Sequence, residues 1–413
     1  MSRPKLKVQK LNGGLGRRTP SAIMVTACVM QAVALAGLVY ETIYELKSVE
    51  DAEALGLNEA YDTTNKVLVY HHLKRFFFRN PSATLHFMPV AQTVTLADMC
   101  DKDQDYLAKV YKSKAGEIRQ GFVALNPAAA YVPTIEEGLD DDVIAAVTKA
   151  QALADAEFAK DRFAITFIEG RSFTGTATAL KNFRTLAEAA PDVAVVLGAD
   201  NDISISDAAY TGYAAVGDIV GLVTKSAVSQ NAGELTEDFN LTDADEEAFI
   251  NAGLSSGKHI DEYSDTDLDT LNDKGFIFGV ATSGIAGFHI VDTHTCDALD
   301  SDYAFVENVR TINEMIRAAR ASLLPRMKGR LYVDPDSGKL APNTVKEMEL
   351  STIASQNNLL SDGDLSGGVD CYIDPDQNIL ATSELQVLLT AVPVAIGRQI
   401  TLKIGFKNPK TNS

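Results

Sequence analysis

Cysteine is scarce in this chain. Only four cysteines occur among 413 residues, they lie far apart, and no two of them form a CxxC pair. A disulfide framework needs many cysteines in a short chain, and a zinc site needs ligands at close, regular spacing. The sequence therefore indicates neither kind of site, no cofactor is expected, and the reducing cytoplasm is the expected compartment.

Basic residues are also scarce over most of the length. Residues 1–20 contain six lysines and arginines, residues 398–413 contain four, and neither segment contains an acid. The other 27 basic residues stand against 56 acidic ones, so a strongly acidic body lies between two basic ends. Because nucleic-acid phosphates are bound by clustered lysine and arginine, the body is not expected to bind nucleic acid.

Both basic ends alternate between apolar and polar residues. Such a period of two is typical of a half-buried strand, and a strand at a chain end needs a partner. We therefore predict that both ends are exchange arms, which complete their sheets with strands from neighbouring copies of the same protein. The arm residues are Ile400, Leu402, Ile404 and Phe406 at the C-terminus and Lys5, Leu6 and Val8 at the N-terminus.

A strong membrane-spanning run is absent. Residues 19–40 carry no charge and follow Arg17 and Arg18, which superficially resembles a secretory signal. Thr26, Gln31 and many alanines and glycines make this stretch only weakly apolar. It is expected to be a buried strand followed by a loop, without membrane insertion.

Helix and strand patterns alternate through the first two thirds of the chain. This order predicts an α/β fold, mixed α+β in detail, with a partly parallel sheet. The expected strands cover residues 38–46, 84–90, 121–125, 163–168 and 193–197. The expected helices cover residues 48–56, 62–79, 138–160 and 176–189.

Charge and pattern changes divide the chain into four segments. They are an N-terminal exchange arm (1–20), a main α/β body (21–296), a smaller C-terminal domain (297–397) and a C-terminal exchange arm (398–413). Within the body, residues 234–273 contain thirteen acids and one lysine. We predict that this acidic stretch is an exposed insertion, since strongly charged segments with few aromatics stay in solvent.

A glycine-rich run near the N-terminus has two interpretations. Gly13, Gly14 and Gly16 resemble the glycines of a phosphate-binding loop, and a nucleotide-binding α/β enzyme is therefore the alternative function. The run lacks the Lys-Ser/Thr ending of such a loop, and no long strand precedes it. A flexible hinge between arm and body is favoured, because glycine has the widest range of backbone φ angles.

Three sets of residues resemble metal sites but fit them poorly. Asp265, Asp267 and Asp269 begin like a calcium loop, but Thr270 and Phe276 replace the required glycine and glutamate, so a solvated loop is expected. His71 and His72 are adjacent on a helix and point in different directions, as ordinary surface or boundary histidines do. Asp292, His294 and Cys296 share one strand face without an obvious fourth ligand.

No serine, histidine and aspartate set has a recognisable nucleophile context, so the chain is not expected to be an enzyme.

The strongest local pattern is a helix over residues 303–323 with one apolar stripe. Its members recur at spacings of four and three: Phe305, Val309, Ile312, Ile316, Ala319 and Leu323. Arg310, Arg317 and Arg320 lie outside the stripe and are either a solvated face or a docking strip for an acidic partner.

Several segments resemble a known family, the tail sheath proteins of contractile phages, R-type bacteriocins and related contractile injection systems. The resemblance rests on GGLGRRTPS near the start, VEDAEALGL, YHHLKRFFFRNPSATLHFMPV, FVENVRTINEMIRAARASLLPRMKGRLYV and the strand-like C-terminal tail. These motifs span both ends and much of the middle of the chain. The acidic stretch 234–273 departs from the resemblance.

This resemblance implies a structural function. Sheath subunits form hexameric rings that stack helically around an inner tube, and the lattice shortens when the baseplate triggers it. The implied partners are other sheath subunits, the inner tube protein, the baseplate and a tail terminator. It further implies that residues 21–296 form the outer part of the sheath, that the C-terminal domain lies near the tube, and that Arg310, Arg317 and Arg320 face it. Assembly is expected in the cytoplasm, followed by residence in the finished particle.

Overall fold

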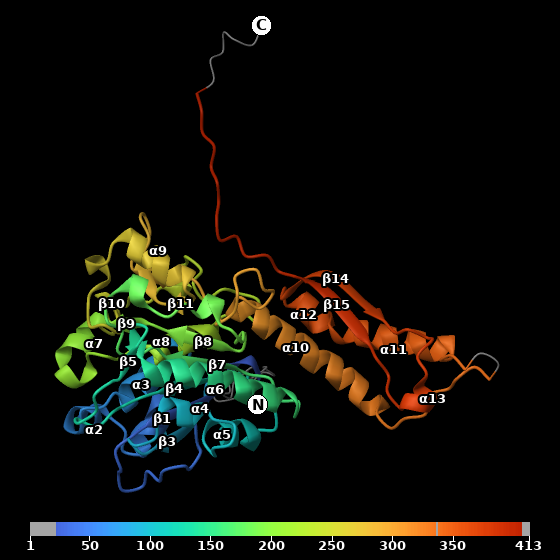
Figure 1. Cartoon of the computed structure of the whole chain (residues 1–413), viewed down its shortest axis with the longest axis horizontal. Coiled ribbons are helices and arrows are strands. Elements are labelled where there is room, and N and C mark those ends of the chain that lie inside the picture. Colours follow the sequence, from blue (N-terminus) through green and yellow to red (C-terminus); the bar gives the residue numbers. More distant parts are fainter. Residues whose placement is uncertain (1–21, 336–337, 407–413) are drawn as a thin grey trace, which may run out of the picture. The chain divides into compact units, whose positions relative to one another are not determined.

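The computed structural model describes residues 22–335 and 338–406 (Figure 1). These residues form two compact units that divide between Glu314 and Met315. We call residues 22–314 the body and residues 315–406 the C-terminal unit. The division falls within helix α10 (Val306–Leu323).

A seven-stranded sheet forms the centre of the body. Its strand order is β11-β8-β7-β4-β1-β3-β2, and all neighbouring strands are parallel except β2 and β3. Continuous apolar runs are typical of parallel strands that are covered on both faces, and every residue of β3, β4, β7 and β8 is buried. The predicted α/β fold with a partly parallel sheet is confirmed. The strands are β1 (Val25–Gln31), β2 (Tyr44–Leu46), β3 (Thr84–Val90), β4 (Gln120–Ala124), β7 (Ile165–Glu169), β8 (Val193–Val196) and β11 (Phe276–Ile277).

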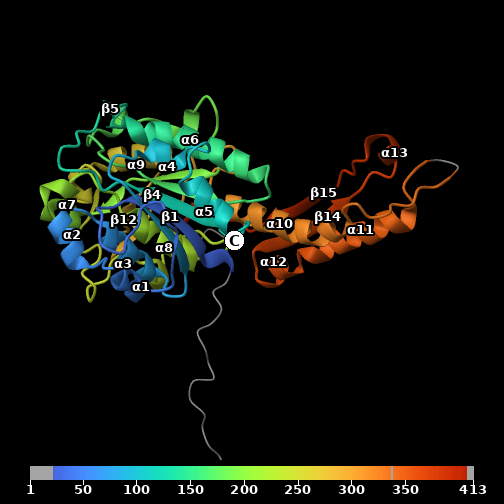
Figure 2. The ribbon, with the colours of Figure 1, turned by 90° about the horizontal axis from the view of Figure 1, so that it is seen from below.

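Helices cover both faces of this sheet. Figure 2 shows α4, α5 and α6 on one face and α1, α3 and α8 on the other. The helices of the body are α1 (Val49–Ala54), α2 (Glu59–Asn65), α3 (Val69–Arg79), α4 (Leu96–Cys100), α5 (Leu107–Ser113), α6 (Asp141–Phe158), α7 (Asn201–Ser206), α8 (Val216–Lys225) and α9 (Asp265–Asp273). Three short antiparallel pairs complete it: β5 (Ile135–Glu136) with β6 (Leu139–Asp140), β9 (Gly198–Asp200) with β10 (Ala252–Leu254), and β12 (Gly279–Ala281) with β13 (Phe288–Ile290).

The uncharged stretch near the N-terminus is a central strand of the sheet. Its residues 25–31 form β1, which lies between β3 and β4 and is almost entirely buried. The expected buried strand is therefore confirmed. Among the described residues, no helix has the length and apolar character needed to cross a membrane.

Two expected elements of the first hundred residues are wrong in extent. The strand predicted for 38–46 is confined to β2, because Glu41 has a left-handed backbone with φ of 59°. The helix predicted for 62–79 is two helices, α2 and α3, because Lys66 ends α2 with φ of 56°. The Asp62 carboxylate then accepts backbone N–H groups from the first turn of α3.

The helix predicted for residues 176–189 is also wrong. This segment contains two 3₁₀ turns, Ala177–Ala179 and Phe183–Thr185. The Lys274 ammonium donates hydrogen bonds to three backbone carbonyls at the first turn, those of Ala177, Thr178 and Leu180. These carbonyls are the acceptors that an α-helix would have used for its own bonds, so the tertiary contact favours the tighter turn.

The prediction that residues 234–273 form an exposed insertion is wrong. Phe239, Leu241, Phe249, Leu254 and Leu271 are buried in the main core, and β10 pairs with β9. The expected solvated loop at 265–269 is instead the start of α9, whose first turn is capped by a reciprocal Ser264–Asp267 capping box. Many acids of this stretch lie on its outer side while its apolar residues complete the body core.

The C-terminal unit is a helix-covered hairpin. Strand β14 (Leu365–Tyr372) pairs antiparallel with β15 (Leu388–Pro393), and one face of β14 packs on α11 (Pro342–Ser355) and α12 (Asn357–Ser361). A short helix, α13 (Ile379–Thr382), lies in the connection between the strands. A 3₁₀ turn, Leu324–Arg326, follows α10.

Candidate assembly interface

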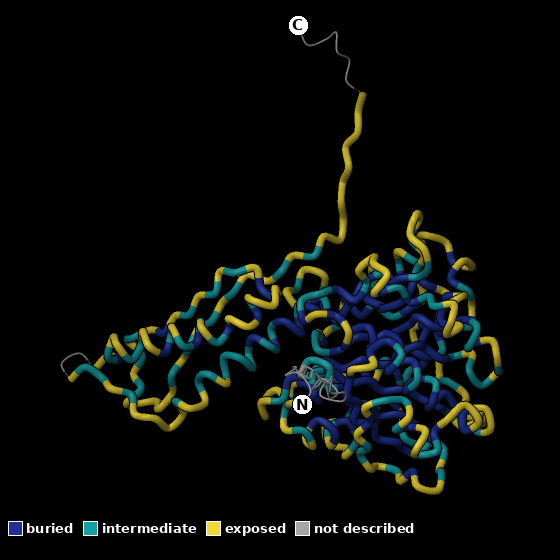
Figure 3. Tube along the Cα trace, turned by 180° about the vertical axis from the view of Figure 1, so that it is seen from behind, coloured by how far each residue is buried: buried dark blue, intermediate teal, exposed yellow. Residues whose placement is uncertain are grey.

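The predicted C-terminal arm is exposed along its described length. Residues 394–406 form no strand within the described part of the chain. Ile400, Leu402, Ile404 and Phe406 are large apolar side chains, and the least exposed of them, Leu402, is still 76% exposed. Figure 3 shows this segment as continuously exposed. Covering this row of apolar side chains by a partner would be favourable, because it would remove apolar surface from water.

The β14–β15 hairpin has open hydrogen-bonding edges among the described residues, because its sheet has two strands. Its side chains alternate along β14 between half-buried and exposed positions. The exposed face carries the apolar residues Tyr372, Leu388 and Val392, of which Tyr372 and Leu388 are cross-strand partners. Open edges of this kind are templates for strands of other chains.

The charge around the hairpin is opposite to that of the arms. Residues 361–397 contain six acids and no lysine, arginine or histidine. The predicted arms, residues 1–20 and 398–413, contain ten basic residues and no acid. An arm from another copy would therefore meet a hairpin of complementary charge.

The N-terminal arm and hinge predictions concern residues outside those the structure describes. Lys5, Leu6 and Val8 and the glycines 13, 14 and 16 all precede residue 22. They stay predictions.

The basic residues of α10 do not form one exposed strip. Arg310 is buried at 5% exposure, and its guanidinium donates hydrogen bonds to Ser226 Oγ at 2.8 Å and to Ala227 O at 3.1 Å. The expectation that Arg310 lies on an outward face is therefore wrong: the side chain ties α10 to the end of α8. Arg317 and Arg320 are half-buried.

The apolar stripe expected on this helix is also only partly buried. Val309 is buried, whereas Ile312, Ile316 and Leu323 are half-buried. Polar contacts instead hold the first turn of α10 in the body. Glu307 is buried there and accepts hydrogen bonds from Thr293 and Asn231. Periodicity located the helix, but polar partners elsewhere in the chain decided which face is inside.

Side chains of the chain itself bind one another at the strand ends where such a sheet usually binds a ligand. Strand order reverses at β1 and β4, and α/β proteins bind nucleotides at the carboxyl ends of strands at such a point. Here the Gln31 amide donates to Gln92 O at 3.0 Å and Val94 O at 2.7 Å, and its oxygen accepts the N–H of Asn126. The Asn126 side chain donates to Gln31 O and accepts the N–H of Leu68. These hydrogen bonds join the ends of β1 and β4 to each other and to the start of α3.

The other motifs are structural. Asp292 accepts a hydrogen bond from Asn231, His294 contacts Arg184 and Asn272, and burial raises the pKa of the Cys296 thiol. Among the described residues, no three metal-ligating side chains converge on one point.

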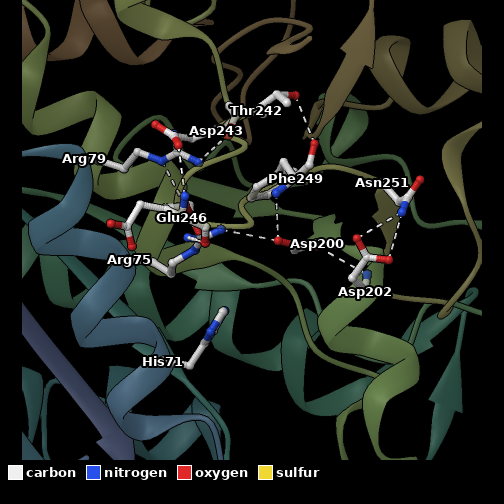
Figure 4. Close-up of polar contacts among 12 residues, drawn as sticks. His71, Arg75, Arg79, Asp200, Asp202, Thr242, Asp243, Glu246, Phe249 and Asn251 are labelled. Carbon is white, nitrogen blue, oxygen red and sulfur yellow. Dashed lines mark hydrogen bonds and ion pairs between the residues drawn. The ribbon is translucent and has the colours of Figure 1, made fainter. Parts of the chain in front are cut away.

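A buried ionic cluster holds the acidic stretch against α3 (Figure 4). Arg79 Nε lies 2.9 Å from Asp218 Oδ1 of α8, and Arg75 reaches both Asp218, at 3.5 Å, and Asp200, at 3.4 Å. Arg79 also donates to the carbonyls of Asn240 and Leu241. Sequence reasoning missed this cluster; the available signal was two arginines one turn apart beside a run of three phenylalanines.

Burial and charge act in opposite directions on the two carboxylates of this cluster. Burial raises the pKa of Asp200 to about 6. Burial also opposes the ionisation of Asp218, but Arg75 and Arg79 outweigh it and hold the pKa of that carboxyl below its usual value. Asp200 in addition accepts the backbone N–H of Phe249 at 2.8 Å, which fixes the acidic stretch in place.

Two glycines let α3 and α8 approach closely enough to form these pairs. A Cβ at Gly217 would lie 2.5 Å from His72 O, and one at Gly221 would lie 2.7 Å from Arg79 Cβ. Contacts this short do not occur between packed atoms, so each position requires a glycine.

His72 should make the stability of the body dependent on pH. Burial lowers the pKa of His72 to about 4, whereas an unfolded histidine titrates near 6.5. The unfolded state therefore binds more protons between these values, so the stabilisation is present above about pH 6.5 and is lost as the pH falls toward 4. Over that range this histidine lowers the free energy of unfolding by about 2–3 kcal/mol.

The measurement compares urea unfolding of the parent and of His72→Gln at pH 7 and at pH 4.5. Burial raises the pKa of Asp62 to about 7 and that of Asp200 to about 6, and these groups act in the opposite direction in both proteins. Burial and the neighbouring His72 lower the pKa of His71 to about 3, so the difference between the proteins reports His72 together with its effect on His71. The variant should show the smaller loss on acidification. Equal losses would contradict a buried neutral His72.

Family models match almost the whole chain. The N-terminal domain of DUF2586 matches residues 3–294, and the C-terminal domain of DUF2586 matches residues 302–411. The chain belongs to the DUF2586 family. No curated protein matches this DUF2586 chain.

Solved structures share the fold over the full length. A chain of the anti-feeding prophage (AFP) baseplate, 6-fold symmetrised, has a TM-score of 0.61 at 14% identity, covering 99% of this chain and 100% of that one. A chain of the AFP helical sheath in the contracted state has a TM-score of 0.57 at 15% identity, with 98% and 100% covered. A chain of the PVC sheath complex of an extracellular contractile injection system, contracted, has a TM-score of 0.59 at 13% identity, with 100% and 99% covered. The DUF2586 chain therefore has the fold found in contractile sheaths.

Proposed function

We propose that this chain is the subunit of a contractile sheath, which polymerises as stacked hexameric rings around an inner tube and shortens to drive that tube through a target envelope. The observation that supports it best is the end-to-end match of both units with chains of the AFP and PVC sheath complexes. The alternative, a nucleotide-binding enzyme, has less support, since Gln31 and Asn126 bind each other at the strand ends where its ligand would lie.

Electron microscopy of the purified chain tests this function. Hollow cylinders of stacked rings are expected, in the absence of any nucleotide. A nucleotide-binding assay on the same sample is the complementary measurement. A soluble monomer that binds ATP or GTP and forms no polymer would favour the enzyme.

The arms are proposed to link neighbouring subunits. Main-chain pairing of an arm with an open edge of the β14–β15 hairpin of another copy would bury the apolar row from Ile400 to Phe406. The basic charge of the arms and the acidic charge of residues 361–397 support this choice of acceptor. Gly13, Gly14 and Gly16 would then be the hinge that keeps the N-terminal arm attached while bodies rotate.

The remaining partners follow from the same proposal. An inner tube protein, a baseplate and a tail terminator would bound the cylinder inside and at its two ends. The chain would assemble in the cytoplasm and then belong to a phage or injection particle. No catalytic step is assigned to it.

Arg317 and Arg320 are proposed to face the inner tube, without Arg310. Changing both to glutamate should abolish tube-filled extended sheaths while still permitting empty polymers. Each contact contributes roughly 1 kcal/mol or less, but a helical lattice repeats it many times. Sheaths assembled with the inner tube protein are counted by electron microscopy, as filled or empty cylinders.

The matched control is the double variant Lys339→Glu and Lys346→Glu. These two exposed lysines of the C-terminal unit give the same change of charge away from α10. The control should fill normally. Normal filling of the Arg317 and Arg320 variant as well, at low and moderate salt, would contradict a tube contact through these residues.

A further inference from the structure

The C-terminal unit buries very little of itself. Within residues 315–335 and 338–406, nine residues are buried, and three of them are polar. They are Met315, Leu340, Met348, Thr352, Gln356, Leu359, Asp364, Leu365 and Ile373. Figure 3 shows the contrast with the body, whose interior is continuously buried. A segment of this length normally has a contiguous core of its own.

The same unit exposes more large apolar side chains than it buries. Twelve are exposed among its described residues: Leu324, Met327, Tyr332, Leu350, Tyr372, Leu380, Leu388, Val392, Ile400, Leu402, Ile404 and Phe406. The body exposes eleven over a segment more than three times as long. Single exposed apolar residues are ordinary, but an excess of this kind marks a surface that is covered in the functional state.

Folding of the free unit is therefore weakly driven. Ordering each residue costs conformational entropy whether or not a core forms, and burial of apolar surface is the main term that offsets it. Leu340, Met348 and Ile373 form one small apolar cluster in the described part of this unit. It offers far less burial than the body core, which continues through β1, β3, β4, β7 and β8.

We infer that the C-terminal unit is an incomplete domain in the free subunit, and that a second copy of this chain completes it, so that its ordering is coupled to assembly. This inference rests on the proposed sheath function. The occupant is a second copy because the complementary surface belongs to the chain itself. Its basic arm carries an alternating apolar row, and residues 361–397 carry an apolar face among six acids.

Coupling of this kind has a functional consequence. Free subunits keep a stable body and a loosely ordered C-terminal unit. Their hairpins therefore lack the ordered edge on which an arm of another free subunit would pair. Each subunit that joins an existing ring finds ordered neighbours and gains the burial that it lacks alone. Growth from a ring is then favoured over the start of a new polymer.

Hydrogen exchange followed by mass spectrometry tests the inference on the full-length chain. In the dilute, unassembled subunit, peptides from α11, β14 and β15 should exchange about a hundredfold faster than in cylinders. Peptides from β1, β3 and β4 should be protected equally in both states. Exchange of the hairpin as slow in the free subunit as in cylinders would overturn the inference.

Failure of the sheath proposal is distinguishable from failure of this inference. If no polymer forms, the proposed function fails, and the free subunit still decides the inference. Slow hairpin exchange there, comparable with that of the body strands, would overturn it. Fast exchange that slows as the subunit concentration rises would support completion by a second copy outside a sheath lattice, and fast exchange at every concentration would overturn it.

A pair of variants tests the covered face. Leu388→Ser changes a 59% exposed residue on the outer face of the hairpin, and Val132→Ser changes an 80% exposed residue of the body. In cylinders, Leu388→Ser should raise hairpin exchange about tenfold, while Val132→Ser leaves it unchanged. Equal protection in the two variants would overturn the coverage of this face.

Discussion

A subunit that lacks residues 399–413 is expected to stay folded and soluble and to lose its ability to polymerise. The described part of this segment contributes almost nothing to its own chain, since Ile400, Leu402, Ile404 and Phe406 are exposed. Its removal therefore leaves the body core intact, but it removes the strand proposed to join subunits. Deletion of residues 1–12 should have the same effect. Circular dichroism checks folding, and electron microscopy counts cylinders.

Point variants separate the apolar face of this arm from its mere presence. Leu402→Asn together with Ile404→Asn changes one face of the predicted strand, and Thr401→Asn together with Gly405→Asn changes the other. The first pair should prevent polymerisation and the second should permit it, because side chains of a strand alternate between faces. Full-length cylinders from either truncated subunit would refute arm exchange.

Replacing Asp218 with asparagine should cause the largest loss of stability that we predict. Asp218 is 1% exposed and is the shared acceptor of Arg75 and Arg79. Removing its charge leaves two buried guanidinium groups with Asp200 as their one remaining carboxylate in the cluster. Removal of one partner from a buried ion pair typically costs about 3–5 kcal/mol. Urea unfolding followed by circular dichroism measures the shift of the midpoint.

The control for this prediction is an exposed ion pair between α2 and α3. Lys74 of α3 pairs with Glu59 at 2.9 Å, but the Glu59 side chain is 75% exposed. Glu59→Gln should change the stability by about 0.5 kcal/mol or less, because solvent screens an exposed pair. An Asp218→Asn protein as stable as the Glu59→Gln protein would mean that the cluster is not held by charge.

The ionic cluster also explains how an acidic stretch became part of the body. Arg79 binds the carbonyls of Asn240 and Leu241, and Asp200 binds the N–H of Phe249. These contacts bring the chain back over α3 and α8, so that the apolar residues between the acids enter the core. Loss of Asp218 is therefore expected to loosen residues 240–249 before the central sheet.

The central architecture was predictable from local patterns. The buried strands at 25–31, 84–90 and 120–124 are short apolar runs between turn signals, and the long helix α6 follows from its length and its acidic first turn. Alternation of such elements indicates a parallel sheet, since each crossover needs a helix. The exchange arms stay a prediction, which rests on period-two alternation and charge because these are properties of neighbouring residues.

The tertiary structure decided those local features that depend on contacts with residues far away in the sequence. Arg310 turned inward because Ser226, 84 residues earlier, offers it hydrogen bonds, and a helical pattern carries no information about such a partner. Residues 177–179 form a 3₁₀ turn, and the Lys274 ammonium, almost a hundred residues later, binds the carbonyls of Ala177 and Thr178 in this turn and that of Leu180 after it. The sequence by itself determined the central strands β1, β3 and β4, the long helix α6 and the charge of the ends. The fold alone decided which charged side chains are buried, because only a partner brought close by folding offsets the loss of hydration.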